Sequence, residues 1–370
     1  MRILKYLSNL PGWSTKRKIV VIESDDWGSI RMPSLAAYHR LKAQGLNIDV
    51  KDNKRFNTLD TLANVEDFEA LYQTLSSFKD SKGNHPVFTA MALSANPDFK
   101  KIKRDNFKNY HYQPITETFE QYGIGDVLEY WKKGEELHIF APEFHGREHL
   151  NVNIWMNALQ KGDSHTLAAF EEGFWGFRPQ NLDGLAYQSA FYLDKKENLA
   201  EHKKIINTGV ELFEQLHKRK PRFFVPPNGS IHQEVVNAAA KAGMTYVSSS
   251  KIHLEPQGNG KTKKRFRYLG KKGKNKLIYL TRNCFFEPSY TGKGFSIEDC
   301  LAQMEVAFQF NKPAIISSHR VNYVGGLNLQ NRDAGNLALK SLLTQILNKW
   351  PEVEFKTSVQ LGDLIRNDKK

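Results

Sequence analysis

Short apolar runs that end in polar side chains recur along the chain, and they predict a parallel β-sheet. Residues 18–22 form one such run, and Glu23, Ser24, Asp25 and Asp26 follow it at once. Continuous apolar runs of this length are typical of strands that are buried on both faces. Further strands are predicted over residues 86–93, 137–141, 222–225, 244–247, 277–280, 314–316 and 353–355.

Segments with apolar side chains at helical spacing separate these strands. Leu35, Tyr38 and Leu41 form one such stripe, and helices of this kind bury one face against a core. Other helices are predicted over residues 68–78, 125–133, 231–242, 297–310 and 334–348. Strands joined by helices imply parallel pairing, and polar groups at successive strand ends favour a (β/α) barrel. A doubly wound open sheet would produce a similar alternation and is the alternative.

Two segments depart from this alternation. Residues 151–220 are predicted to be a helical insertion, and residues 255–280 a basic hairpin. A chain of 370 residues can form one barrel domain with such insertions, so we expect a single domain over residues 1–370.

The positive charge of the chain is concentrated in one place. Residues 261–276 contain nine Lys or Arg and no acid, so the rest of the chain carries +4 of the net +13. A solvated hairpin is the simplest interpretation, and weak contact with an anionic substrate or a membrane surface is the alternative. We expect no nucleic-acid partner, because no stacking pattern or binding motif accompanies the charge.

The cysteines and the amino-terminal residues favour a cytoplasmic protein. Cys284 and Cys300 are the only cysteines, which argues against a disulfide framework and a thiolate metal site. Residues 1–18 lack the apolar stretch of a signal peptide, and no later segment has the length of a membrane span. The oligomeric state is not determined by these features.

Histidines and aspartates that follow predicted strands suggest a metal site. His145 and His149 are four residues apart, a spacing that would place them on one face of a helix. Two neutral imidazoles and one carboxylate leave a position on zinc open for water. Asp25 and Asp26 would point apart on an extended backbone, so one can bind metal while the other acts as a base.

Each of these signals also has a simpler explanation. The aspartate pair could cap a helix, and His319, which follows the run at 314–316, could be a hydrogen-bonded structural residue. Among 12 histidines, chance alone supplies about 0.4 pairs at this spacing, and Gly146 stands where a zincin needs Glu. The metal hypothesis therefore depends on all the groups lying at strand ends.

At the level of motifs, the chain resembles the polysaccharide deacetylase family of metal-dependent carbohydrate esterases. Four stretches carry the resemblance, in the family's order: Ser24-Asp25-Asp26-Trp27, His145-Gly146-Arg147-Glu148-His149, Phe224-Val225-Pro226-Pro227-Asn228-Gly229 and Ser318-His319. The resemblance implies an irregular barrel, for which we expect seven strands. It also implies removal of acetyl groups from an N- or O-acetylated sugar or polysaccharide precursor.

The resemblance also implies roles for individual residues. Asp26, His145 and His149 would hold a divalent metal, most simply zinc, while Asp25 would act as the base and His319 as the general acid. The residues expected to contact an acetylated carbohydrate substrate are Trp27, Arg147, Pro227, Asn228 and Arg320.

The third motif departs from the family pattern. Val225 stands in place of the arginine that orients the catalytic aspartate, and Asn228 in place of a tyrosine. Arg147, Arg31 and Arg320 are candidates for the missing role, and Arg282 and Glu287 lie where a fourth motif is expected. The missing arginine motivates the alternative of a non-catalytic carbohydrate-binding protein. A metal hydrolase of a different bond on a related barrel is the third hypothesis.

Overall fold

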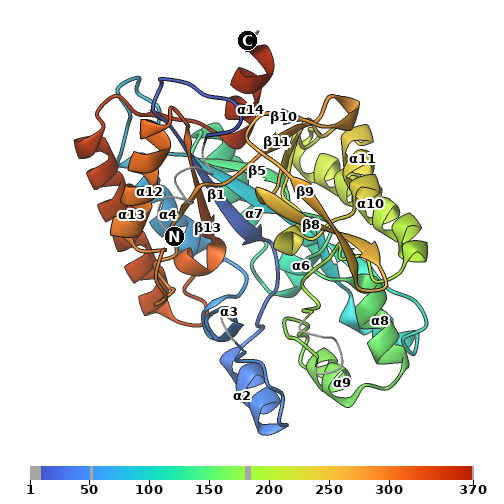
Figure 1. Ribbon diagram of the computed structural model, residues 1–370. Helices are drawn as coiled ribbons and strands as arrows, with labels where there is room; N and C mark the ends of the chain where they lie inside the picture. The colour runs from blue at the N-terminus through green and yellow to red at the C-terminus, as the bar shows by residue number, and fades with distance from the viewer. Residues whose placement is uncertain (1–9, 51–52, 180–184, 369–370) are drawn as a thin grey trace.

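The computed structural model describes residues 10–50, 53–179 and 185–368, and a mostly parallel ten-stranded sheet forms its centre (Figure 1). The strands pair in the order β10-β11-β7-β6-β5-β2-β1-β13-β12, and β14 pairs with β1. Their bounds are β1 Ile19–Trp27, β2 Phe88–Ala92, β5 Phe140–Phe144, β6 Phe223–Phe224, β7 Tyr246–Ser248, β10 Lys271–Lys272, β11 Ile278–Leu280, β12 Cys284–Phe285, β13 Ala314–His319 and β14 Glu354–Phe355. Only the β10–β11 pair of this sheet is antiparallel within the described ranges. The predicted α/β class with a mostly parallel sheet is confirmed.

The number of strands differs from the predicted seven for a local reason. β10 and β14 are two-residue additions, and β11 and β12 are two parts of one stretch that residues 281–283 interrupt. The first part pairs with β7 and the second with β13, so this stretch reaches from one end of the strand order to the other. The hydrogen-bonded order nevertheless ends at β10 and β12, and the closed barrel stays a prediction.

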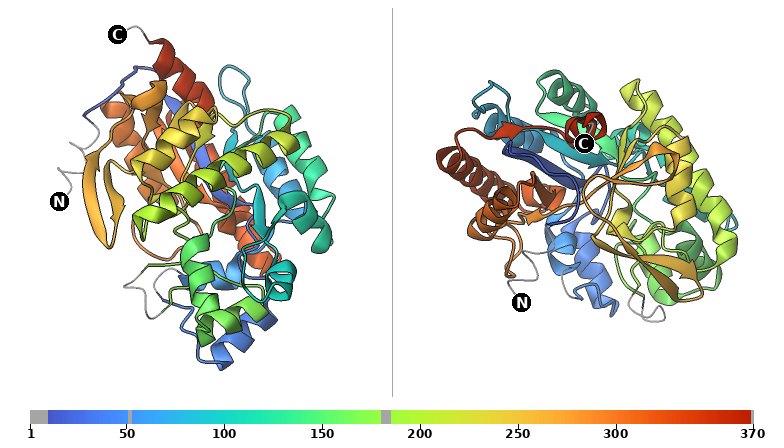
Figure 2. Two further views of the ribbon diagram at one scale, coloured as in Figure 1. Left: turned by 90° about the vertical axis from the view of Figure 1, so that its right-hand side faces the viewer. Right: turned by 45° about the horizontal axis from the view of Figure 1, so that its top comes forward.

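Helices surround the sheet on its outer side (Figures 1 and 2). Their bounds are α4 Val65–Ser76, α7 Val127–Glu136, α10 Leu199–His217, α11 Gln233–Lys241, α12 Ile297–Gln309 and α13 Leu329–Lys349. α14 (Ser358–Asn367) lies instead over one end of the sheet, at the top of Figure 1. An aromatic cluster joins helices to sheet: the Trp27 ring lies 4.9 Å from Phe140 and 5.3 Å from Phe68. Among the described helices, none combines the length and the apolar character needed to cross a membrane.

The predicted helical insertion has two parts in the structure. α8 (Val152–Gln160) and α9 (Ser164–Glu171) project below the sheet with α2 (Leu35–Ala43) and α3 (Asn53–Leu59), as Figure 1 shows. α10 instead packs against α11 in the layer around the sheet. The insertion proper therefore ends before α10, and the single-domain organisation stays a prediction.

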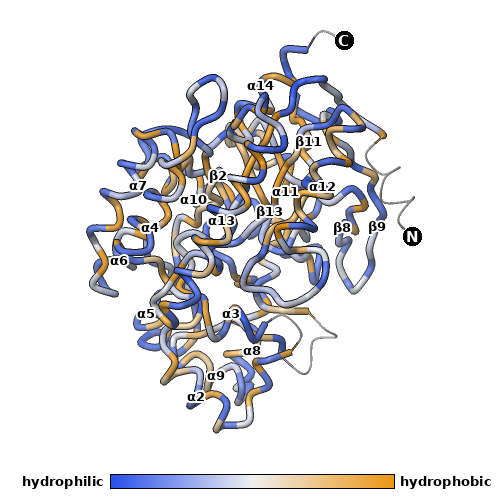
Figure 3. The backbone as a smooth tube through the Cα atoms, turned by 90° about the vertical axis from the view of Figure 1, so that its left-hand side faces the viewer, coloured by the Kyte–Doolittle hydropathy of each residue, from blue (hydrophilic) through white to orange (hydrophobic). Residues whose placement is uncertain are grey.

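The predicted basic hairpin lies earlier in the chain than expected. Its strands are β8 (Ile252–Gly258) and β9 (Lys261–Phe266), which pair with each other and not with the main sheet. β10 and β11, which the prediction included, pair in the main sheet. The hairpin itself stands at the edge of the molecule (Figures 2 and 3).

Candidate functional site

The strand β1 is longer than its apolar run and carries charged side chains into the interior. We predicted its end at Ile22, but it continues to Trp27, and all nine of its residues are buried. Parallel pairing with β13 places Asp25 beside His319, and pairing with β2 shifts register between Ser24 and Trp27. The site lies where these strands end.

Asp26 has an unusual backbone conformation within β1. Its φ is +79°, a region that side chains other than glycine rarely adopt and that costs conformational energy. The register shift in the same place interrupts the regular alternation of side chains. Together these features explain how the Asp25 and Asp26 side chains reach different partners.

Asp26, His145 and His149 converge at the end of β1 and in the loop after β5. Asp26 Oδ1 lies 3.4 Å from His145 Nε2 and 3.2 Å from His149 Nε2. One ligand atom from each residue lies within 4.8 Å of the others, and all three side chains are buried. Asp26 Oδ1 and His145 Nε2 have no hydrogen-bond partner among the described residues. Buried polar atoms without partners are costly, so this arrangement suits a bound cation.

The two histidines reach this position from a loop and not from a helix. Residues 145–149 have no helical structure, and Gly146 has φ +117°, so the helical explanation of their spacing was wrong. His145 Nδ1 donates a hydrogen bond of 2.7 Å to the Val225 carbonyl, because that carbonyl can only accept. This bond leaves the lone pair of the ring on Nε2, the nitrogen that faces Asp26.

Burial favours a neutral imidazole in this cluster, and the surrounding positive groups favour an ionised carboxylate. Burial lowers the pKa of His149 to about 4. Burial by itself would raise the pKa of Asp26, but Arg31 and the two histidines hold it well below its usual range. Arg31 Nη2 donates to Asp26 Oδ2 at 2.5 Å. Two neutral nitrogens and a carboxylate oxygen are a donor set that fits zinc.

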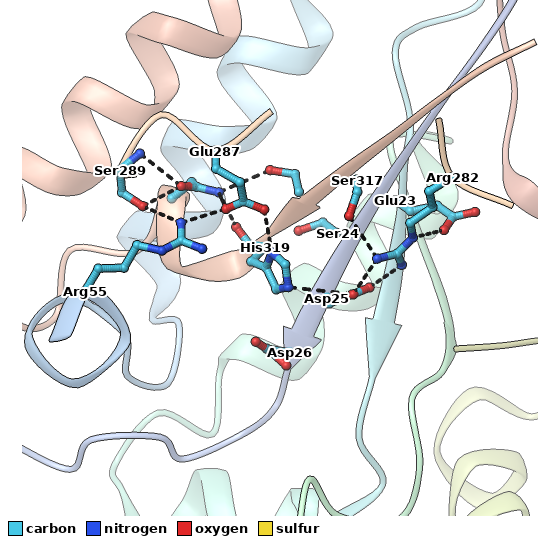
Figure 4. Close-up of polar contacts among 12 residues, drawn as sticks. Glu23, Ser24, Asp25, Asp26, Arg55, Arg282, Glu287, Ser289, Ser317 and His319 are labelled. Carbon is cyan, nitrogen blue, oxygen red and sulfur yellow. Dashed lines mark hydrogen bonds and ion pairs between the residues drawn. The ribbon is translucent and has the colours of Figure 1, made fainter. Parts of the chain in front are cut away.

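Asp25 is fixed by an arginine from the stretch between β11 and β12. Arg282 Nη1 and Nη2 each donate to one Asp25 oxygen at 2.6 Å, and Arg282 Nε donates to Glu23 at 2.5 Å (Figure 4). Burial disfavours the charged form of Asp25, but Arg282 outweighs it and lowers the pKa of this carboxyl. Arg282, and not Arg147, Arg31 or Arg320, is therefore the arginine that binds both oxygens of Asp25.

His319 lies between Asp25 and a second buried carboxylate (Figure 4). Its Nε2 is 3.9 Å from Asp25 Oδ2, and its Nδ1 is 2.5 Å from Glu287 Oε1. Arg55 and Asn322 donate to the other oxygen of Glu287 at 2.7 and 2.8 Å. Although burial opposes the charged form of His319, Glu287 raises the pKa of its ring to about 9. His319 therefore holds a proton at neutral pH.

A cavity of about 690 Å³ connects these groups. Its wall includes Asp25, Asp26, His145, His149, Arg282 and His319. The rest of the wall is part polar and part apolar, and its polar side chains include Asn53, Asn228, Ser248, Ser249 and Ser250. Hydroxyl and amide groups of this kind can hydrogen-bond a polyhydroxylated ligand.

Of the five residues expected to contact substrate, only Asn228 lies on this wall. Trp27 is buried in the aromatic cluster and donates to Ser24 Oγ at 3.1 Å. Pro227 is buried, and its ring lies close to Gly146. These two residues support the site from behind the cavity wall.

The two predicted arginines are buried in ion pairs of their own. Arg147 donates through Nε and Nη2 to Glu148 at 2.6 and 2.9 Å. Arg320 donates to Asp60 at 3.0 and 2.8 Å and to the Ser29 carbonyl. Neither lies on the cavity wall, so the structure does not place these guanidinium groups where a substrate in the cavity would meet them.

Four residues hold the catalytic candidates: Arg282, Glu287, Arg55 and Arg31. Sequence reasoning placed Arg282 and Glu287 where a fourth motif is expected without assigning them partners, considered Arg31 for Asp25, and did not name Arg55. Their only signal was position, since Arg282 and Glu287 follow a predicted strand as the other candidates do. Charge and spacing alone could not assign them partners.

Comparisons with known proteins give weak likenesses. No protein-family model matches the chain, and no curated protein matches it. A candidate polysaccharide deacetylase from Mycobacterium smegmatis is a similar solved structure, with 13% identity over 97% of this chain and 94% of that chain and a TM-score of 0.47. A candidate glycoside hydrolase/deacetylase from Parabacteroides distasonis has 10% identity over 96% of this chain and 73% of its own, with a TM-score of 0.48. A CE4 family pseudoenzyme from Bacillus anthracis has 12% identity over 94% of this chain and 66% of that chain, with a TM-score of 0.36. At these scores the function has to be argued from the site itself.

Proposed function

We propose that this protein is a metal-dependent hydrolase that removes acetyl groups from an N- or O-acetylated carbohydrate. One observation carries the proposal. The unpartnered Asp26 Oδ1 and His145 Nε2 converge with His149 beside an ionised Asp25 and a protonated His319, all on one cavity wall. A hydrolase needs such an arrangement: a cation site, a base and an acid within reach of one substrate.

In the proposed reaction the residues of the chain act as follows. Asp26, His145 and His149 would hold the ion, which when bound supplies a water of lowered pKa and polarises the acetyl carbonyl. Asp25 would accept, at a carboxylate oxygen, a proton from the water that adds to the acetyl carbon. His319 would donate its Nε2 proton to the nitrogen or oxygen of the sugar as the bond between that atom and the acetyl carbon breaks, which releases acetate. Arg282 keeps Asp25 charged and oriented, and Glu287 does the same for the His319 imidazolium.

The cavity wall and the motifs of the sequence both support a carbohydrate as substrate. The wall is rich in hydroxyl and amide side chains, which suit the hydroxyl groups of a sugar. The motif resemblance to polysaccharide deacetylases points the same way. A non-catalytic binding protein was suggested by the missing third-motif arginine, and Arg282 now removes that reason, because it binds the aspartate by two hydrogen bonds.

Metal content and acetate release test the proposal together. We expect the purified protein to bind about one equivalent of zinc and to release acetate from acetylated oligosaccharides, and chelation to abolish the release. His145→Ala should lose the bound metal, because it removes one of three ligands. His39→Ala, an exposed histidine on α2, is the matched control and should keep it. Metal that persists in His145→Ala would contradict the ligand assignment, and release that survives chelation would contradict the reaction.

The raised pKa of His319 predicts an alkaline limit to activity. Because its pKa lies near 9 in place of the usual 6.5, kcat/KM should stay constant through neutral pH and fall above about 9. The charge of His319 also contributes to the stability of the fold. This contribution is complete below about pH 6.5 and is lost as pH rises through about 9.

Removing the counterion should move this limit. In Glu287→Gln the fall in kcat/KM should begin at a lower pH, because the imidazolium loses its partner. Glu298→Gln, at an acid in the first turn of α12, is the control and should leave the profile unchanged. A pH–rate profile identical in Glu287→Gln and the parent protein would rule out the assigned role.

A further inference from the structure

The outer face of the β8–β9 hairpin exposes apolar side chains among basic ones. Ile252, Leu254 and Phe266 are 56%, 53% and 64% exposed. Ile252 pairs with Phe266 and Leu254 with Lys264 across the two strands, so these four side chains share one face. Large apolar side chains that are exposed as a cluster on one face mark an interaction surface, whereas isolated ones do not.

The opposite face of the hairpin is fastened to the body of the protein. His253 donates to the Ile231 carbonyl at 2.9 Å, and Glu255 accepts from the Gln233 backbone at 3.0 Å and from Arg265 at 2.5 Å. At the turn, the Asn259 backbone donates to the Asp194 carbonyl at 2.6 Å. These contacts hold the hairpin in place at the edge of the molecule (Figure 3), with its outer face turned away from the body of the protein.

The charge around this face selects its partner. β9 and the segment after it, residues 261–276, carry nine basic side chains and no acid, and Glu255 of β8 is paired with Arg265 on the opposite face. Lys271 extends the patch, since it donates to the Phe266 carbonyl at 2.7 Å and lies over the Tyr268 ring. Two copies of so basic a surface would repel each other. A nucleic acid would satisfy the charge but leave the aliphatic side chains in water.

We propose that the outer face of this hairpin docks on an anionic lipid bilayer. Lys264 and Lys271 meet the phosphate headgroups, while Ile252, Leu254 and Phe266 enter the boundary between headgroups and acyl chains. Interfacial binding of this kind combines buried apolar area with attraction to anionic lipid, and neither part suffices alone. The inference is independent of the proposed reaction, because it involves none of the residues assigned to the site.

Co-sedimentation of the full chain with vesicles tests the docking. We expect binding to phosphatidylcholine vesicles that contain about a quarter phosphatidylglycerol, little binding to phosphatidylcholine alone, and loss of binding in about 0.5 M salt. Lys264→Glu with Lys271→Glu should weaken binding at least about tenfold. Ile252→Ser with Leu254→Ser and Phe266→Ser should weaken it by a similar factor.

Matched controls separate docking from general surface effects. Lys100→Glu with Lys340→Glu changes two exposed lysines elsewhere, and Leu329→Ser with Leu337→Ser changes two exposed leucines of α13. Both should bind as the parent protein does. Equal binding to neutral and anionic vesicles, no effect of the apolar substitutions, or equal losses in the controls would overturn the proposal.

A label at position 266 keeps the test independent of variant folding. The native thiols of Cys284 and Cys300 are buried, so an environment-sensitive dye on Phe266→Cys reports on the hairpin alone. Its emission should shift to the blue on anionic vesicles. If duplex DNA shifts the emission and vesicles do not, the face binds nucleic acid. If the protein is a dimer that the triple Ser substitution dissociates, and no vesicle binding occurs, the face binds a second copy. Either result overturns docking on a bilayer.

Discussion

Asp25→Asn is expected to lower kcat/KM for acetate release by about 10²- to 10⁴-fold while the bound metal remains. The asparagine keeps the size of the side chain but cannot accept the proton of a water molecule, and general-base assistance is worth about this factor. The metal should stay because Asp26 and the two histidines, not Asp25, form the cluster of convergent ligand atoms. Acetate release and zinc content, measured on the same preparations, check both halves of the expectation.

Asp333→Asn provides the matched control for this experiment. Asp333 is 66% exposed on α13 and pairs only with the neighbouring Arg332 among the contacts described. The same chemical change there should leave kcat/KM and zinc content unaltered. Unchanged turnover in Asp25→Asn would remove Asp25 as the base, and loss of zinc would place Asp25 among the ligands.

Arg282→Met is expected to lower the free energy of unfolding by about 3–5 kcal/mol near neutral pH. Arg282 is the guanidinium that neutralises both Glu23 and Asp25, which are 0% and 6% exposed. Its removal leaves two neighbouring buried carboxylates without that cation. Removing one partner of a buried ion pair typically lowers stability by about this amount. Urea denaturation at pH 7 measures the change.

The pH dependence of this destabilisation has a definite sign. In the parent protein the pKa of Asp25 is lowered. The charge of this carboxylate therefore contributes stability at pH values above the usual pKa of an aspartate, and the contribution is lost as pH falls through the lowered pKa. Without Arg282, burial raises the pKa of this carboxyl, and protonation relieves the repulsion between Asp25 and Glu23. The variant should therefore be closest to the parent protein in stability at acidic pH and furthest from it above neutrality.

A surface arginine with the same geometry serves as the control. Arg222 donates to both oxygens of Asp363 at 3.0 and 2.5 Å, but the two side chains are 40% and 38% exposed. Arg222→Met should cost no more than about 1 kcal/mol, because water solvates the carboxylate that is left behind. Equal losses in the two variants would show that Arg282 makes no special contribution. Arg282→Lys keeps the charge but loses the paired N–H donors of the guanidinium, so its loss of stability should lie between those of Arg282→Met and Arg222→Met.

The local pattern of the sequence was enough to predict the central strands. β2, β5, β7, β11 and β13 each overlap a predicted apolar run. Burial on both faces requires apolar side chains at nearly every position, and this requirement is visible without any knowledge of neighbours. The same reasoning ended β1 too early, because Glu23, Ser24, Asp25 and Asp26 are buried by virtue of partners elsewhere in the chain.

The sequence by itself determined which chemistry-bearing residues follow the strands. Asp25, Asp26, His145, His149 and His319 were all identified from their positions after apolar runs, and all five lie on one cavity wall. Parallel strands bring their carboxyl ends to one side of a sheet, so a residue's place after a strand predicts its place in the fold.

Only the tertiary structure decided how these residues are held and charged. Asp25 and Arg282 are 257 residues apart in the chain, and His319 and Glu287 are 32 apart. Arg147, Arg31 and Arg320 were equally plausible partners for Asp25, yet they bind Glu148, Asp26 and Asp60. Hydrophobic patterning is a local property of the chain, whereas the partner of a buried charge depends on which strand ends meet in space. That dependence is why the sequence identified the candidate reacting groups and the fold alone assigned their counterions.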